Sequence, residues 1–316
     1  MIDFRYHLVS LIAVFLAVAL GIVIGTTQLN GPLTDNLQGQ VTALQDDKRG
    51  LEDQTQQLQT QLDDVGSFEE AVGPTLVENT LAGRSVVLVI GTGEGVTTGV
   101  VEGLTALLGS AGATVTGTIR LTEGYGDPAG DTELQSYLTG PGMPPGTLPA
   151  ETDDVSELLA TRLADVLMIP GAGGTAPAPE ASATSTVLAG LEELEVLSRD
   201  TSSVSPADFA VFLTAGTLTG EEAGDRTAAL VELVAALDAR GSGAVVAGDQ
   251  AADGDGGLVA AVRGDATVTG SVSTVDNVTT PAGRISTVLA LVAEGQGTTG
   301  EYGVGEDTQP VPLPTS

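Results

Sequence analysis

The side chains best placed for chemistry in this sequence are acidic and amide groups that follow apolar, β-branched stretches. Asp249 ends the stretch GAVVAGD (243–249), and Asp276 and Asn277 lie near the end of the stretch 268–278. Open α/β sheets bind ligands at the carboxyl ends of their strands, so we expect these three side chains at that edge. Asp and Asn also cap helices and hold loops, and this structural role is the favoured one. The sequence thus predicts one candidate sheet-edge site.

Other residues offer little chemistry. The chain has no cysteine, so a disulfide, a thiolate metal site and a cysteine nucleophile are all excluded. Its single histidine, His7, precedes the N-terminal apolar segment, and no Ser-His pair can form in the rest of the chain. Of the three methionines, Met1 starts the chain, Met168 falls in a predicted buried strand, and only Met143 is expected at the surface. We predict a protein that is not an enzyme, without catalytic residues or an evident cofactor, and no metal site is assigned.

A glycine-rich turn, Gly91-Thr92-Gly93-Glu94-Gly95, lies where a dinucleotide-binding turn would follow the first strand. Its spacing differs from G-x-G-x-x-G, and Arg120 stands at the end of the second predicted strand instead of an acidic residue. Glu94 would also repel a phosphate group. We interpret these glycines as a tight strand-to-helix turn rather than as a cofactor site.

The charge of the chain limits its partners. The chain of 316 residues has 11 basic and 42 acidic side chains, and its net charge is −31. Such a strongly negative charge argues against nucleic-acid binding. Apolar residues make up 41% of the chain, and this content is not that of a disordered protein.

Strands and helices alternate through most of the chain. This alternation predicts an α/β fold, a mostly parallel Rossmann-like αβα sheet domain at 84–298. A connector at 69–83 precedes this domain, a loop occupies 124–153, and a proline-containing disordered tail is expected at 299–316. The predicted strands are 85–93, 113–119, 165–171, 208–215, 243–249 and 268–278, and the predicted helices are 96–108, 155–164, 187–194, 226–240, 258–262 and 281–293.

The N-terminal segment reads as a membrane anchor. From Leu8 to Gly25 the sequence carries no charge, and at about 1.5 Å per helical residue this stretch spans roughly 27 Å. The alternative is a signal peptide cleaved after Ala17-Val18-Ala19, but apolar residues continue beyond that point. We predict a transmembrane helix at 8–27. The charge bias favours a cytoplasmic N-terminus at 1–7, so the protein would be a single-pass plasma-membrane protein with its C-terminal bulk extracytoplasmic.

A stalk is predicted at 28–68, with Asn30-Gly31-Pro32 interrupting or kinking the helix at its start. Beyond this interruption a heptad repeat predicts a parallel, dimeric coiled coil. The rival interpretation is a helix that packs on its own globular domain. The d-like positions are Leu37, Leu44, Leu51, Leu58 and Val65, and the a-like positions are Val41, Lys48, Thr55 and Leu62.

Small residues recur every four positions in the membrane helix, at Ala13, Ala17, Gly21 and Gly25. This spacing lets two transmembrane helices approach closely, although it also arises by chance in a chain rich in Ala and Gly. Together with the heptad repeat it favours a homodimer.

The opening DFRYHLVSLIAVFLAVALGIVIG, the coiled coil after it and the late STVDNVTTPAGRISTVLALVAEGQGTTGEYGVG resemble the actinobacterial MctB family of copper transporters or channel-forming envelope proteins. The resemblance covers essentially the whole chain. It implies a role in copper homeostasis and an envelope location, so copper enters by resemblance alone. The related SteB proteins of corynebacteria imply another role, in cell separation, with a SteA-like partner and a cell-wall hydrolase system.

The residues bear on these two functions. Copper prefers Cys, Met and His ligands, which this chain largely lacks. One apolar helix per chain encloses no aqueous pore, even in a dimer, and the predicted strands lack the pattern of a membrane barrel. Two hypotheses follow: copper transport or homeostasis, by resemblance, and a dimeric scaffold that binds division or peptidoglycan-remodelling partners.

Overall fold

One seven-stranded sheet organises the C-terminal part of the protein. The computed structural model describes residues 4–92, 95–144, 154–172, 174 and 177–312, with only the backbone of 26–36 and 38. The strand order is β3-β2-β1-β4-β5-β6-β7, and all neighbours are parallel except β2 and β3. The predicted mostly parallel α/β sheet is therefore confirmed. The strands are β1 Ser85–Ile90, β2 Thr114–Leu121, β3 Leu197–Arg199, β4 Phe209–Leu213, β5 Ala244–Ala247, β6 Ser273–Val275 and β7 Glu301–Tyr302.

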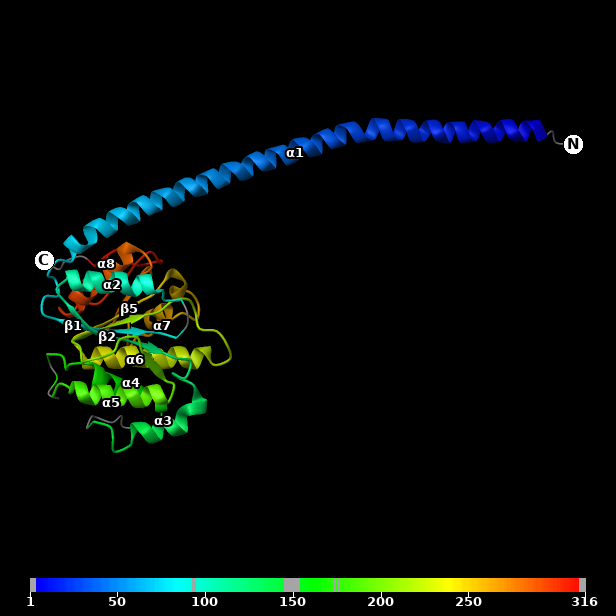
Figure 1. Cartoon of the computed structure of the whole chain (residues 1–316). Helices are drawn as coiled ribbons and strands as arrows, with labels where there is room; N and C mark the ends of the chain where they lie inside the picture. Colours follow the sequence, from blue (N-terminus) through cyan, green and yellow to red (C-terminus); the bar gives the residue numbers. More distant parts are fainter. Residues whose placement is uncertain (1–3, 93–94, 145–153, 173, 175–176, 313–316) are drawn as a thin grey trace. The chain divides into compact units, whose positions relative to one another are not determined.

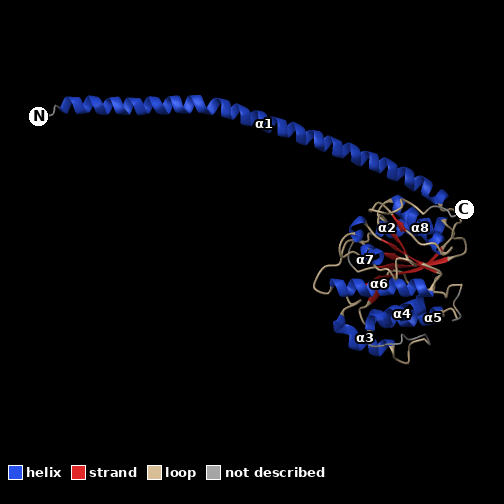
Figure 2. Cartoon of the chain, turned by 180° about the vertical axis from the view of Figure 1, so that it is seen from behind, coloured by secondary structure: helices blue, strands red, loops and turns tan. Residues whose placement is uncertain are grey.

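Helices cover both faces of the sheet (Figure 1; Figure 2). The helices α2 (Thr98–Ser110) and α8 (Pro281–Glu294) pack on one face. On the other lie α4 (Val155–Leu167), α6 (Ala223–Arg240) and α7 (Leu258–Gly264), with α3 (Asp131–Leu138) and α5 (Ala181–Glu193) packed beside them. Alternate side chains of β1 enter the two cores, so the strand is apolar throughout: Val86, Leu88 and Ile90 face one core, and Val87 and Val89 face the other.

Two segments between β2 and β4 differ from the sequence prediction. The loop predicted at 124–153 is described only to residue 144, and 145–153 lie outside the described residues. The described part contains a 3-10 turn at Pro128–Gly130 and the helix α3, which buries Leu134 and Leu138 one turn apart. Residues 165–171, predicted as a strand, instead complete α4 and make a single bridge, from Met168 to Ala207. The reason is the helical spacing of the apolar residues of α4, which continues through Leu163, Val166 and Leu167.

Both edges of the sheet were missed from the sequence. The strand β3 has only three residues and pairs antiparallel with β2. The strand β7 falls within 299–316, and the prediction of a disordered tail is wrong for 299–312. Tyr302 is buried, and Gln309 forms a further bridge to it. Residues 313–316 lie outside the described part of the chain.

A single long helix, α1 (Phe4–Leu76), precedes the sheet. It runs through Asn30-Gly31-Pro32 without interruption, contrary to the prediction of a break there, and it includes 69–76, the first half of the predicted connector. The chain forms two compact units, Met1–Val65 and Gly66–Ser316, so the last turns of α1 belong to the α/β unit.

Candidate functional site

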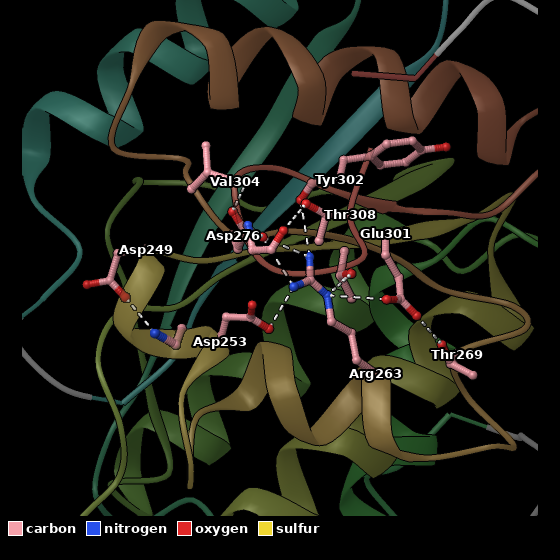
Figure 3. A network of polar contacts seen from close by, with 12 residues as sticks. Asp249, Asp253, Arg263, Thr269, Asp276, Glu301, Tyr302, Val304 and Thr308 are labelled. Carbon is pink, nitrogen blue, oxygen red and sulfur yellow. Dashed lines mark hydrogen bonds and ion pairs between the residues drawn. The ribbon is translucent and has the colours of Figure 1, made fainter. Parts of the chain in front are cut away.

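The carboxyl ends of β5 and β6 hold the predicted sheet-edge residues Asp249, Asp276 and Asn277. Figure 3 shows the first two of them. Asp249 follows β5 and caps the 3-10 turn Gln250–Asp253, where its Oδ1 accepts the N–H of Ala252 at 2.9 Å. The same oxygen accepts the N–H of Gly216 at 2.8 Å, so it also fixes the loop after β4. Asp249 thus takes the structural role.

Asp276 is the centre of a buried ionic network. Its side chain is 0% exposed, and its Oδ2 accepts two hydrogen bonds from the guanidinium of Arg263, each at 3.2 Å. Arg263 lies in α7 and also pairs with Asp253 at 2.6 Å and with Glu301 at 3.9 Å. Its Nε donates to Thr274 at 2.9 Å, and Nη2 donates to the carbonyl of Tyr302 at 3.1 Å. One arginine therefore joins α7, β6 and β7 (Figure 3).

The loop after β7 wraps around the Asp276 carboxylate. Val304 N–H donates to Oδ1 at 2.7 Å, and Gly305 N–H donates to Oδ2 at 3.1 Å. Gly303 has φ +135°, and a Cβ at this position would lie 2.0 Å from Asp276 Oδ1. Only glycine lets the backbone approach the carboxylate this closely, which explains the glycine at position 303 in the sequence YGVG. The network therefore serves as a latch that holds the C-terminal segment on the sheet.

Asn277 plays a different part from its neighbour. It is buried beside the N-terminus of α8, and its Oδ1 has no hydrogen-bond partner among the described residues. A Cβ on Gly283 would lie 2.0 Å from the Asn277 carbonyl oxygen, so α8 begins in close contact with this turn. Sequence reasoning placed Asp276 and Asn277 at this edge of the sheet but did not identify Arg263 as the partner of Asp276.

The described residues contain no group of three or more His, Cys, Asp or Glu side chains placed to hold a metal ion. The three carboxylates of the latch all pair with Arg263, and Asp276 also accepts two backbone N–H groups, so the positive charge already at their centre disfavours a metal ion there. Met168 is buried, and Met143, expected at the surface, is partly buried against the core. Copper ligands of the preferred soft type therefore do not converge in the described part of a single chain.

Two acidic side chains, the buried Glu294 and the partly buried Asp238, lie near the amino ends of β5 and β6. Glu294 of α8 accepts the N–H of Ser273 at 2.6 Å, and Asp238 of α6 accepts the N–H of Ala244 at 3.2 Å. Burial raises the pKa of Glu294 to about 8, and the nearby Asp238 carboxylate contributes to the rise. Burial also raises the pKa of Asp238 to about 6. The one sequence feature that reflects this close packing is Gly243, because a Cβ at that position would lie 2.6 Å from Cβ of Glu294.

The last turns of α1 dock on α8 through polar contacts that the sequence did not reveal. Glu69 Oε2 accepts the N–H of Ala282, in the first turn of α8, at 3.2 Å. Glu70 pairs with Arg284 at 3.5 Å. Gly73 gives close contact, since a Cβ there would lie 3.0 Å from Cδ1 of Ile285.

The rest of α1 carries the two predicted dimer faces. Phe4–Gly25 has a mean hydropathy of 2.9, and it is the one helix in the described chain long and apolar enough to cross a membrane. In the heptad repeat, all the apolar members are more than half exposed: Leu37, Val41, Leu44, Leu51, Leu58, Leu62 and Val65. The seam is thus uncovered in a single chain.

The continuity of α1 separates these two faces. At about 100° per residue, Ala13, Ala17, Gly21 and Gly25 lie roughly 120–160° around the helix from Leu37. The small residues and the heptad seam therefore face different directions. Both interfaces remain predictions, but one continuous α1 does not join them into one strip.

Sequence and structure together define an α/β protein preceded by one helix suited to a membrane anchor. A profile of the family "Copper transport outer membrane protein, MctB" matches residues 1–313. The copper transporter MctB of Mycobacterium tuberculosis is 31% identical over 315 residues, covering 98% of this chain and 99% of that protein. The copper transporter MctB of Mycobacterium leprae is 31% identical over 328 residues, covering 99% and 100%. The chain belongs to the MctB family.

Proposed function

We propose that this chain takes part in copper transport or homeostasis in the cell envelope, as an anchored homodimer. The observation that carries the proposal is the MctB family match over residues 1–313. Relatives matched over almost their whole length bear the name copper transporter, so the family function extends to a protein of this architecture.

The dimer would form through the heptad seam as a parallel coiled-coil stalk. Its support is the register of the apolar residues and their exposure in the single chain. Lys48 at an a-like position favours two strands over a larger bundle at some cost in stability. The apolar helix Phe4–Gly25 would anchor each chain in the plasma membrane, with Arg5 and the N-terminus on the cytoplasmic side and the α/β unit outside.

The α/β unit would be a Rossmann-like domain. Its support is the strand order, which matches the order 3-2-1-4-5-6 of dinucleotide-binding sheets with one strand added. The antiparallel β3 departs from that pattern. No cofactor is proposed, since the turn after β1 lacks the glycine spacing of a phosphate-binding loop.

Copper would not be held by a ligand cluster among the described residues of one chain. We expect the purified full-length protein in detergent to bind neither Cu(I) nor Cu(II) stoichiometrically at submicromolar concentration. Deletion of the gene should nevertheless change cellular copper content and copper sensitivity, and the wild-type gene should restore both. Tight, stoichiometric copper binding would contradict the absence of a site.

The alternative is a scaffold for cell-wall remodelling, as in SteB-like proteins, favoured by the exposed seam and the lack of a metal cluster among the described residues. A deletion strain with normal copper handling and defective cell separation would support it over the copper role. Crosslinking in membranes, followed by identification of a SteA-like partner or a wall hydrolase, would test it directly.

A further inference from the structure

Three apolar side chains lie on one face of the last turns of α1, within the α/β unit. Phe68 is 65% exposed, Leu76 is 57% exposed, and Val72 between them is partly buried. Residues four apart on a helix share a face, so these three form a continuous strip, here named the distal stripe. Phenylalanine is rare in this chain, with five in 316 residues, and one of them stands largely in solvent here.

The α/β unit itself cannot cover the distal stripe, because α1 is fixed in rotation. Gly73 faces Ile285, Val77 is completely buried, and Glu69 is bonded to the backbone of α8. Rolling α1 to bury Phe68 would break these contacts. Only another molecule can therefore cover the distal stripe.

The register of the sequence points to a second copy of the same chain. Counting by sevens from the heptad seam, Val72 takes the next d-like position after Val65, and Leu76 is a-like. Glu69 takes the a-like position between Val65 and Val72, where two like charges would repel across a dimer. In the structure the Glu69 carboxylate instead accepts the N–H of Ala282, so its charge is directed at α8 and not across the predicted dimer. The apolar repeat can then continue past Val65.

We infer that the distal stripe is a contact between two copies of this chain, in which Phe68, Val72 and Leu76 meet the same residues of the second copy. This inference rests on the proposed dimer and extends it from the stalk to the α/β unit. Parallel pairing about a two-fold axis makes the contact self-complementary. An apolar contact here would oppose the repulsion between two units of strongly acidic composition.

The absence of native cysteine permits a clean test. Single variants Leu76→Cys, Leu58→Cys and Ala71→Cys of the full-length protein in membranes are treated with a short bismaleimide. Leu58 reports on the stalk, and Ala71 is an exposed control off the stripe. We expect Leu76→Cys to crosslink as fully as Leu58→Cys, and Ala71→Cys to remain mostly monomeric.

The outcomes separate the inference from the dimer on which it rests. Crosslinking at Leu58 but not at Leu76 would overturn the distal contact and leave the stalk dimer intact. Equal crosslinking at Ala71 and Leu76 would also overturn it, since proximity would then be nonspecific. No crosslinking at any position would overturn the dimer itself. As a second measurement, Phe68→Ser should raise the dimer dissociation constant of the full chain by about tenfold, while Ala71→Ser should leave it unchanged.

Discussion

Replacing Glu294 by Gln should remove most of the pH dependence of stability between pH 5 and 8. The side chain is 6% exposed and lies near Asp238, with the Tyr302 ring also in its surroundings. Burial raises its pKa from an ordinary 4.5 to about 8. Gln keeps the shape and an oxygen that can accept the Ser273 N–H, so the substitution changes mainly the charge.

The direction follows from the raised pKa. Below about pH 4.5 the carboxyl is protonated in both the folded and unfolded states, and it adds no pH dependence. As the pH rises toward 8, the unfolded chain releases this proton while the folded chain keeps it, so the free energy of unfolding falls. The pKa difference, at about 1.36 kcal/mol per pH unit, amounts to at most roughly 5 kcal/mol. Above pH 8, Glu294→Gln should be more stable than wild type by a few kcal/mol.

Urea unfolding of the full-length protein in detergent, followed by tyrosine fluorescence, measures this directly. The chain has no Trp, and three of its four tyrosines, at 125, 137 and 302, lie in the α/β unit. The exposed Glu102→Gln is the matched control and should retain the wild-type pH profile. The reasoning is refuted if wild type loses no stability between pH 5 and 8, or if Glu294→Gln follows the same curve.

Three further perturbations test the rest of the structure. Asp276→Asn removes the buried negative charge that pairs with Arg263, so it should lower the free energy of unfolding by about 2–4 kcal/mol in the same urea assay. An unchanged unfolding midpoint would contradict the latch. Gly283→Ala places a Cβ against a backbone carbonyl and should cost about 1–3 kcal/mol, whereas the same change at the open Gly109 should cost nothing. Leu44→Asp combined with Leu51→Asp should give a monomer in sedimentation measurements, with the thermal midpoint of the α/β unit unchanged; a persistent dimer would show that the seam is assigned wrongly.

The parts of the fold that the sequence revealed are those fixed by local pattern. Continuous apolar runs identified β1, β4 and β5, because a strand buried on both faces needs apolar side chains along its whole length. The short edge strands β3 and β7 carry no such signal. Their positions depend on distant side chains, such as Arg263 for the segment after residue 300. Prolines near the C-terminus made that segment look disordered.

The candidate site shows the same limit. Position after a strand was enough to place Asp249, Asp276 and Asn277 at one edge of the sheet. The partner of Asp276 was not predictable from the sequence. Arg263 precedes Asp276 by 13 positions, lies on a different element, and reaches the carboxylate only because α7 packs beside β6. Glu294 was missed for a similar reason: on sequence it is one of 42 acidic residues, and only the fold buries it.

The continuity of α1 changes what the two predicted dimer faces can mean. Small residues at four-residue spacing pack helices with a right-handed crossing, whereas a heptad repeat gives a left-handed supercoil. In one unbroken helix the small residues lie roughly 120–160° away from Leu37, so two chains paired along the heptad seam would turn Gly21 and Gly25 away from each other. We expect the heptad seam to be the stronger determinant of the predicted dimer, because it extends over four heptads and all its apolar members are exposed in the single chain. Gly21→Leu should consequently leave the dimer intact, while a change at Leu51 should not; loss of the dimer in Gly21→Leu would restore the membrane helix as the primary contact.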